Sequence, residues 1–216
     1  MQDGKLGYGY QFWRSTFGFR GDGASGQYAI VVSEKDLAIA ITSCIDNMQS
    51  ILTTLWDELI PALEDEPLPE SPAGNERLLA AASILAMRVM PGTARRPVPH
   101  QTFAFRPNPA GIHSLSVEAG DDECALTFHT DRGFEQLRAG FGSHRVSVFQ
   151  LTDTMPHPTA ASAAWVEDDV LEIQSFCLDG TFRDTYQVRF ADSEHPLTRT
   201  MRCSILRPSM PELTLV

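Results

Sequence analysis

The sequence predicts an α+β fold built from two unlike parts. The first is an antiparallel three-stranded meander closed by a helix, and the second is an all-β barrel or sandwich. Two apolar stretches, 26–33 and 37–43, flank a four-residue polar turn and so predict a β-hairpin. After about residue 100, short alternating stretches recur between turn residues, and eight or nine strands at this spacing indicate an antiparallel sandwich or barrel.

The meander begins with residues 7–15, GYGYQFWRS, which are rich in aromatic side chains and favour a strand. The strands at 26–33 and 37–43 are apolar along nearly their whole length, which is typical of strands buried on both faces. Residues 1–65 contain only one helix to cover these strands, so we expect a second cover from elsewhere.

A helix is expected over residues 46–63. Asp46 is a candidate N-cap, and Gln49 stands three residues later, where a capping box needs it. Apolar residues at three- and four-residue spacing predict a wide stripe that packs on the sheet. The stripe consists of Met48, Ile51, Leu52, Leu55, Trp56, Leu59, Ile60 and Leu63.

The middle of the chain is expected to be a linker followed by a short helix. Residues 64–75, EDEPLPESPAGN, are rich in proline and acidic residues and have no apolar period. Residues 76–89 favour a helix that Pro91-Gly92 ends. The resulting divisions are 1–65, 66–99 and 100–216.

Turn residues separate the strands of the last division, and Trp165 follows a run of small residues there. We expect Trp165 to fill the core, with the small residues allowing a neighbouring element to come close; stacking on a ligand is the alternative. The turn signals are Asn108-Pro109, Gly120-Asp121-Asp122, Asp131-Arg132-Gly133 and Asp179-Gly180.

The charge of the chain argues against two classes of partner. The 216 residues carry 28 acidic and 17 basic side chains, a net charge of −11, which disfavours nucleic acid and anionic membranes. No apolar run reaches the length of a membrane span, and the N-terminus lacks the basic and apolar regions of a signal peptide. Strand-like sequence begins almost at once, so we expect this chain to start inside a longer protein.

Cysteine and histidine spacings show no Cys-x-x-Cys, His-x-x-x-His or His-Cys pattern of the kind that metal and redox sites use. We therefore expect no metal and no cofactor, and we interpret the cysteines as mostly free, buried thiols that favour a reducing compartment such as the cytoplasm. The cysteines are Cys44, Cys124, Cys177 and Cys203; the histidines are His100, His113, His129, His144, His157 and His195.

The order of motifs in residues 7–63 resembles the end of the catalytic domain of serine β-lactamase-like hydrolases. Three motifs precede the amphipathic helix in this order: GYGYQFW, GDGASGQY and SEKDLAIAIT. The family includes class C β-lactamases, penicillin-binding carboxypeptidases, esterases and nylon-oligomer hydrolases. FRPNPAGI and ASAAW, in the last division, are similar to the lipocalin-like β domain that follows some members.

The resemblance implies a substrate-binding edge at residues 21–25. The Lys-Thr-Gly motif of the family falls on Gly21, Asp22 and Gly23, and the backbone N–H of Ala24 would point to the oxyanion hole. Glycines suit such an edge because the substrate must approach the backbone closely. Asp22 brings a negative charge that disfavours the carboxylate of a penicillin, so ester or amide hydrolysis is expected rather than β-lactam hydrolysis.

The nucleophile of this family is missing. Ser-x-x-Lys does not occur, because Lys5 and Lys35 are the only lysines and neither follows a serine by three residues. Tyr-x-Asn does not occur either. Ser25 is a candidate turn hydroxyl or substrate-edge group, and it lacks the Gly-x-Ser-x-Gly context of a nucleophile. We expect the C-terminal part of a hydrolase with no catalytic residue of its own, whose longer protein acts on a small ester, amide or β-lactam.

The sequence is also compatible with two other functions. The alternating strands of the last division could enclose a cavity for a small apolar ligand, in a module without enzymatic activity. The chain could also be a structural element that forms a homo-oligomer through an exposed sheet edge.

Overall fold

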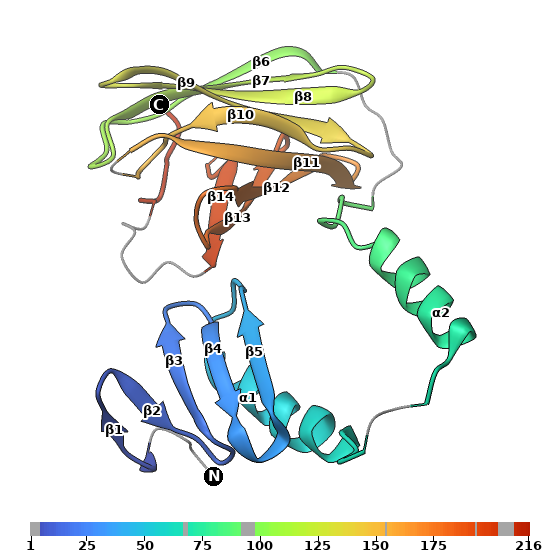
Figure 1. Ribbon diagram of the computed structural model, residues 1–216. Coiled ribbons are helices and arrows are strands. Elements are labelled where there is room, and N and C mark those ends of the chain that lie inside the picture. The colour runs from blue at the N-terminus through green and yellow to red at the C-terminus, as the bar shows by residue number, and fades with distance from the viewer. Residues whose placement is uncertain (1–4, 67–68, 92–97, 154, 193, 203–209) are drawn as a thin grey trace. The chain divides into compact units, whose positions relative to one another are not determined.

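The computed structural model describes residues 5–66, 69–91, 98–153, 155–192, 194–202 and 210–216. The chain divides into two compact units, Met1–Met87 and Arg88–Val216 (Figure 1). Each unit has a sheet and an apolar core of its own. Cys203 and Gly92, both named above, lie outside the described residues.

The first unit contains a five-stranded antiparallel sheet rather than a three-stranded one. Residues 7–15 do not form one strand, because Tyr10 and Gln11 adopt left-handed φ angles of 52° and 67° and turn the chain between two short strands. The glycine-rich segment before Gln27 is itself a strand. In sheet order the strands are β1 (Tyr8–Gly9), β2 (Phe12–Arg14), β3 (Phe19–Gly23), β4 (Gln27–Val32) and β5 (Leu37–Ile41).

The expected helix is present and begins two residues later than predicted. It runs without interruption through α1 (Met48–Thr54), a π-helical turn (Leu55–Leu59) and a 3₁₀ turn (Ile60–Ala62). The predicted capping box is wrong, because Asn47 occupies the N-cap position and makes no side-chain capping hydrogen bond.

One face of the sheet packs on this helix. Tyr28, Ile30 and Val32 alternate along β4 and are buried against Leu52 and Trp56. The predicted apolar stripe is confirmed, with the exception of Leu59, whose exposed fraction is 38%.

The other face of the sheet is open among the described residues, so the expected burial on both faces is wrong there. Ala29 of β4 and Ala38 and Ala40 of β5 are exposed. Alanine made both strands look uniformly apolar in the sequence. In β5 the alanines alternate with larger side chains, and in both strands alternate residues face the helix. Ala29 and the half-buried Val31 of β4 face the other way.

Helix α2 (Pro72–Ser83) begins and ends earlier than predicted. Ser71 caps it by accepting a hydrogen bond from the N–H of Gly74 (3.1 Å), and Pro72 takes the first helical position. The sequence SPAGN therefore starts a helix instead of extending the linker. No residue of α2 is buried. Within the described residues, no helix has the length and apolar character needed to cross a membrane.

The described residues of the second unit form nine strands and no helix, within the predicted eight or nine strands. Its sheet order is β14-β13-β12-β11-β9-β8-β7-β6, and β10 pairs with β11. The pairing is antiparallel except between β9 and β11, which are parallel. The predicted turn signals fall between strands, except that Gly133 is the first residue of β9. The strands are β6 (Val98–Ala104), β7 (Ile112–Ala119), β8 (Glu123–Thr130), β9 (Gly133–Phe141), β10 (Arg145–Phe149), β11 (His157–Glu167), β12 (Val170–Cys177), β13 (Arg183–Arg189) and β14 (Leu197–Arg202).

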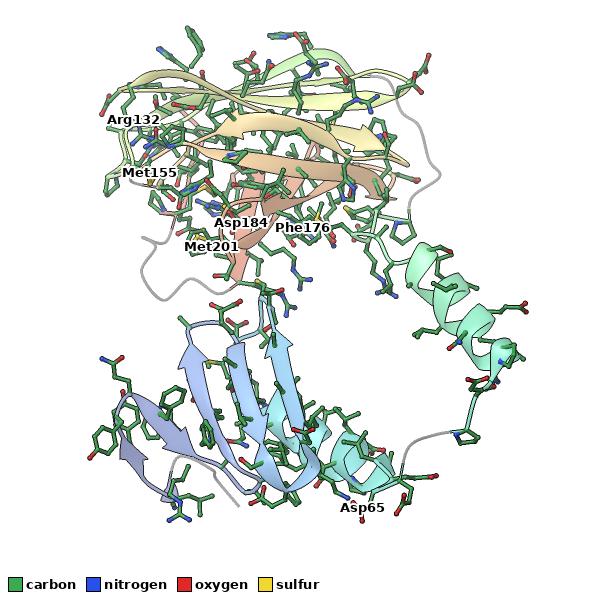
Figure 2. The ribbon with its side chains drawn as sticks, in the orientation of Figure 1. Asp65, Arg132, Met155, Phe176, Asp184 and Met201 are labelled. Carbon is green, nitrogen blue, oxygen red and sulfur yellow. The ribbon has the colours of Figure 1, made fainter. Side chains whose placement is uncertain are left out.

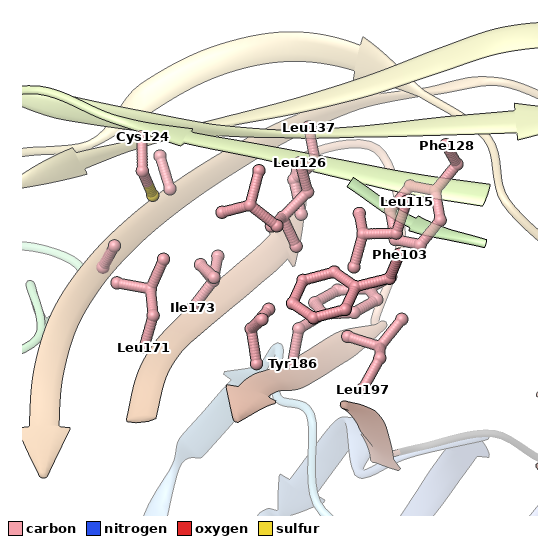
Figure 3. Packing of buried hydrophobic residues seen from close by; sticks show 14 of the residues in the cluster. Phe103, Leu115, Cys124, Leu126, Phe128, Leu137, Leu171, Ile173, Tyr186 and Leu197 are labelled. Atoms are coloured by element: carbon pink, nitrogen blue, oxygen red, sulfur yellow. The ribbon is translucent and has the colours of Figure 1, made fainter. Parts of the chain in front are cut away.

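The sheet of the second unit curls so that β7 and β8 face β12 and β13 across one core (Figures 1 and 3). The rings of Phe128 and Tyr186 meet across it with centroids 6.4 Å apart, and both side chains are fully buried. Burial of each large apolar side chain of this kind contributes about 1.5–3 kcal/mol. Side chains therefore fill the interior.

Trp165 belongs to this core, as predicted, and its ring lies 5.4 Å from that of Phe190. The small residues of β11 also let the chain approach closely. The N–H of Met90 donates to Ser162 Oγ at 3.1 Å, and both residues are buried.

Candidate functional site

The five residues predicted to form a substrate edge lie in one hairpin. Gly21, Asp22 and Gly23 end β3, while Ala24 and Ser25 form the turn into β4. Ala24 is exposed, whereas Ser25 is 4% exposed and has a left-handed φ of 64°.

Hydrogen bonds hold this turn against the segment that leads into α1. The carbonyl oxygen of Ser25 accepts from the N–H of Ile45 (3.1 Å) and from Ser43 Oγ (2.8 Å). Ser43 Oγ also lies 2.8 Å from the carbonyl oxygen of Gly26. Gly26 has a φ of 85°, and a Cβ there would lie 2.3 Å from Ser43 Oγ. Only glycine fits this position, so the turn is shaped by its contacts and does more than reverse the chain.

The start of β4 is tied to the same segment. Gln27 Nε2 donates to the carbonyl oxygen of Ser43 at 2.5 Å, and Tyr28 Oη donates to that of Met48 at 3.0 Å. The hairpin therefore has a fixed position relative to the start of the helix.

Asp22 forms a charge pair with Arg20. Arg20 Nε lies 2.8 Å from Asp22 Oδ1, and Arg20 Nη2 donates to Oδ2 at 3.2 Å. Arg20 is buried and also donates to Ser15 Oγ at 2.7 Å. The two residues share a face because they are two apart on a strand. The carboxylate of Asp22 is thus neutralised locally, which weakens the argument that its charge repels an anionic substrate.

The glycine half of β3 has a free edge. β2 pairs with β3 only at Phe19 and Arg20, so Gly21–Gly23 have a described strand partner only in β4. A Cβ built on Gly21 would meet no atom within 4 Å. Backbone donors and acceptors on this edge can pair with an incoming group, and the space over Gly21 is open.

A hollow of about 420 Å³, which we call the Asp22 hollow, lies on the helix side of this strand. Its described lining contains two basic groups, one carboxylate and one amide, and no serine, threonine or cysteine. The hollow can bind polar groups, but its described lining offers no serine, threonine or cysteine as a nucleophile. It is lined by Lys5, Arg20, Asp22, Tyr28, Met48, Gln49 and Leu52.

A second cluster of reactive side chains lies in the β unit, where the sequence spacing indicated none. His157, Cys177 and Asp179 present ligand atoms that lie within 4.8 Å of one another. Hydrogen bonds from Cys177 and then His157 hold the pKa of Asp179 below its usual value. Twenty residues separate His157 from Cys177, and the pairing of β11 with β12 brings them together.

The chain matches no protein-family model, no curated protein and no solved structure. Assignment of a function therefore depends on the chemistry of the β3–β4 hairpin and of the cluster of His157, Cys177 and Asp179.

Proposed function

We propose that this chain is the C-terminal part of a serine hydrolase of the β-lactamase-like type, in which the β3–β4 hairpin forms one wall of the site for a small ester or amide. The observation that carries the proposal is the free, open edge of Gly21–Gly23 in a hairpin anchored by hydrogen bonds. The nucleophile comes from a segment outside residues 1–216, because Ser-x-x-Lys does not occur in them.

An anchored, glycine-rich edge suits acyl transfer for a physical reason. Negative charge develops on the carbonyl oxygen in the transition state, and backbone N–H groups stabilise it best when they are already in place. The bonds from Ser43 and Ile45 to the turn hold the backbone around Ala24 and Ser25 before any substrate arrives.

The Asp22 hollow beside this edge would receive the polar part of the substrate. Arg20 balances the charge of Asp22, while Lys5 and Gln49 line the same hollow. These groups favour a polar, hydrogen-bonding substrate over a purely apolar one.

In this proposal the second unit is the appended lipocalin-like domain. Its interior is filled by side chains such as Phe128, Tyr186 and Leu126, all fully buried. That packing does not favour the alternative in which the curled sheet encloses a small apolar ligand.

The first test uses the purified chain alone. Residues 1–216 should not hydrolyse a p-nitrophenyl ester or a chromogenic cephalosporin above background, and a fluorophosphonate should label no serine. Stoichiometric labelling of Ser25 would refute the proposal and make this a hydrolase of another kind.

The second test uses the longer protein that supplies Ser-x-x-Lys. Asp22→Asn is preferable to Asp22→Ala because the amide oxygen keeps an acceptor for buried Arg20. We expect Asp22→Asn to lower kcat/KM for an ester by about tenfold, which corresponds to about 1.4 kcal/mol. Asp36→Asn is the matched control, since Asp36 lies in the β4–β5 turn and asparagine tolerates its left-handed φ of 46°. Equal rates for the two variants would contradict the role of Asp22.

A further inference from the structure

The ends of two strands and the turn after them place three metal-binding side chains together. His157 begins β11, Cys177 ends β12, and Asp179 follows in the turn toward β13. Thr159 pairs with Cys177, and the N–H of Leu178 donates to the carbonyl oxygen of Pro158 at 2.8 Å. The three ligands therefore lie on paired backbone, which limits how far they can move apart.

Two of the ligand atoms are directed at the third. His157 Nδ1 lies 2.9 Å from Asp179 Oδ1, and Cys177 Sγ donates to the same oxygen at 3.0 Å. Ligand atoms of a tetrahedral zinc ion lie about 3.3–3.6 Å apart, given the usual zinc–ligand distances. Lengthening each of these two distances by about half an ångström would bring them to this spacing. The third pair, His157 Nδ1 and Cys177 Sγ, lies within 4.8 Å.

We propose that His157, Cys177 and Asp179 bind a zinc ion in the β unit. One thiolate, one imidazole and one carboxylate make a donor set suited to zinc, and three protein ligands leave a fourth position for water. Binding forms a bond from zinc to Cys177 Sγ and releases the thiol proton to solvent. The hydrogen bond that Cys177 donates to Asp179 is thereby replaced by two bonds to the ion.

A small cavity lies beside the cluster and supports a fourth ligand. Its volume is about 20 Å³, and both His157 and Cys177 line it. This volume is enough for one water molecule.

The charges around this cavity favour a cation. Asp153 and Asp184 also line it, and Asp184 projects from β13 (Figure 2). Arg199 pairs with both, with Nη2 2.6 Å from Asp184 Oδ2 and 3.7 Å from Asp153 Oδ2. Arg199 carries one positive charge against these two carboxylates, so the cavity lining keeps a net negative charge that attracts a cation.

The turn is also built closely around the ligands. The ring of Phe182 lies edge-on to that of His157, with centroids 6.1 Å apart. A Cβ on Gly180 would lie 3.1 Å from Cys177 Sγ. These contacts orient the imidazole and let the turn pass close to the sulfur.

The same geometry argues against a cysteine nucleophile. In such enzymes the thiol shares its proton with the imidazole. Here Cys177 donates to Asp179, and the Nδ1 atom of His157 is directed to that carboxylate as well.

The test measures metal binding by the full chain after treatment with a chelator and a reductant. Calorimetry with Zn²⁺ should give one site per chain. Co²⁺ should give the visible bands of a tetrahedral ion and a thiolate-to-metal charge-transfer band in the near ultraviolet. The melting midpoint of the β unit should rise with Zn²⁺ concentration, because an ion that binds only the folded state stabilises it.

Variants identify the ligands. Cys177→Ser, His157→Gln and Asp179→Asn should each weaken Zn²⁺ binding by at least about tenfold, and Cys177→Ser should abolish the charge-transfer band. The controls are Cys44→Ser and His113→Gln, since His113 pairs with Asp131 at 2.8 Å but has no cysteine in its cluster. Neither control should change binding. The absence of Zn²⁺ binding by the folded wild-type chain, or wild-type affinity in all three ligand variants, would overturn the site.

Discussion

Removal of the indole of Trp56 should unfold the first unit while leaving the second intact. Trp56 is 8% exposed and lies in the cluster formed with Tyr28, Ile30 and Leu52. Its ring centroid is 5.5 Å from that of Phe17. The side chain thus joins the helix to the sheet and to the turn before β3.

The size of the effect follows from the buried area. A tryptophan buries about 150–250 Å², which at about 25 cal/mol per Å² corresponds to about 4–6 kcal/mol. Alanine has a higher helix propensity than tryptophan, which offsets about 0.5 kcal/mol of this loss in stability. We therefore expect Trp56→Ala to lower the free energy of unfolding of this unit by about 3–5 kcal/mol, as in other large-to-small core substitutions.

Hydrogen exchange of the full chain, followed by mass spectrometry, separates the two units. Amides of β4 and of the helix should lose protection in Trp56→Ala, and those of β12 should keep it. Leu59→Ala is the control on the same helix, because Leu59 is 38% exposed and should cost about 1 kcal/mol. Equal effects of the two substitutions, or an equal loss in β12, would refute the packing argument.

Four further predictions concern charge, pH, thiol reactivity and association. Arg199→Met should destabilise the β unit by about 3–5 kcal/mol in urea unfolding, because it leaves two carboxylates without their buried cation; a change below 1 kcal/mol would contradict this. Hydrogen bonds from Arg138 and then Arg145 lower the pKa of Glu123 from 4.5, so its contribution to stability is present above pH 4.5 and is lost as the pH falls through the lowered value. Glu123→Gln should flatten this part of the acid unfolding curve, and an unchanged curve would exclude the effect. Burial raises the pKa of Cys124 to about 12, so this thiol should resist iodoacetamide at pH 8 in the folded chain, and rapid labelling would show that the site opens. The chain should self-associate through the edge of β5, whose only described partner is β4; a strict monomer in light scattering at high concentration would argue against it.

Local patterns in the sequence were sufficient for much of the fold. The polar turn between the apolar strands of the hairpin, the stripe from Met48 to Leu63 and the turn residues between the later strands all correspond to elements of the structure. These features depend on the period of side-chain direction within one element, which neighbouring residues alone set. One wrong prediction also had a local cause, since the two left-handed positions of the β1–β2 turn are Tyr10 and Gln11 and neither is a glycine.

The sequence by itself determined which residues make up the hairpin edge, because Gly21 to Ser25 are consecutive and must fold together. Only the tertiary structure decided that this segment is a strand, on which Arg20 and Asp22 share a face and form a charge pair. It also decided that Gly21–Gly23 have no described partner on the β2 side, which depends on the register of β2 against β3. The same holds for the cluster of His157, Cys177 and Asp179. No spacing along the chain marks this set, and it forms because the antiparallel pairing of β11 and β12 brings the start of one strand beside the end of the other.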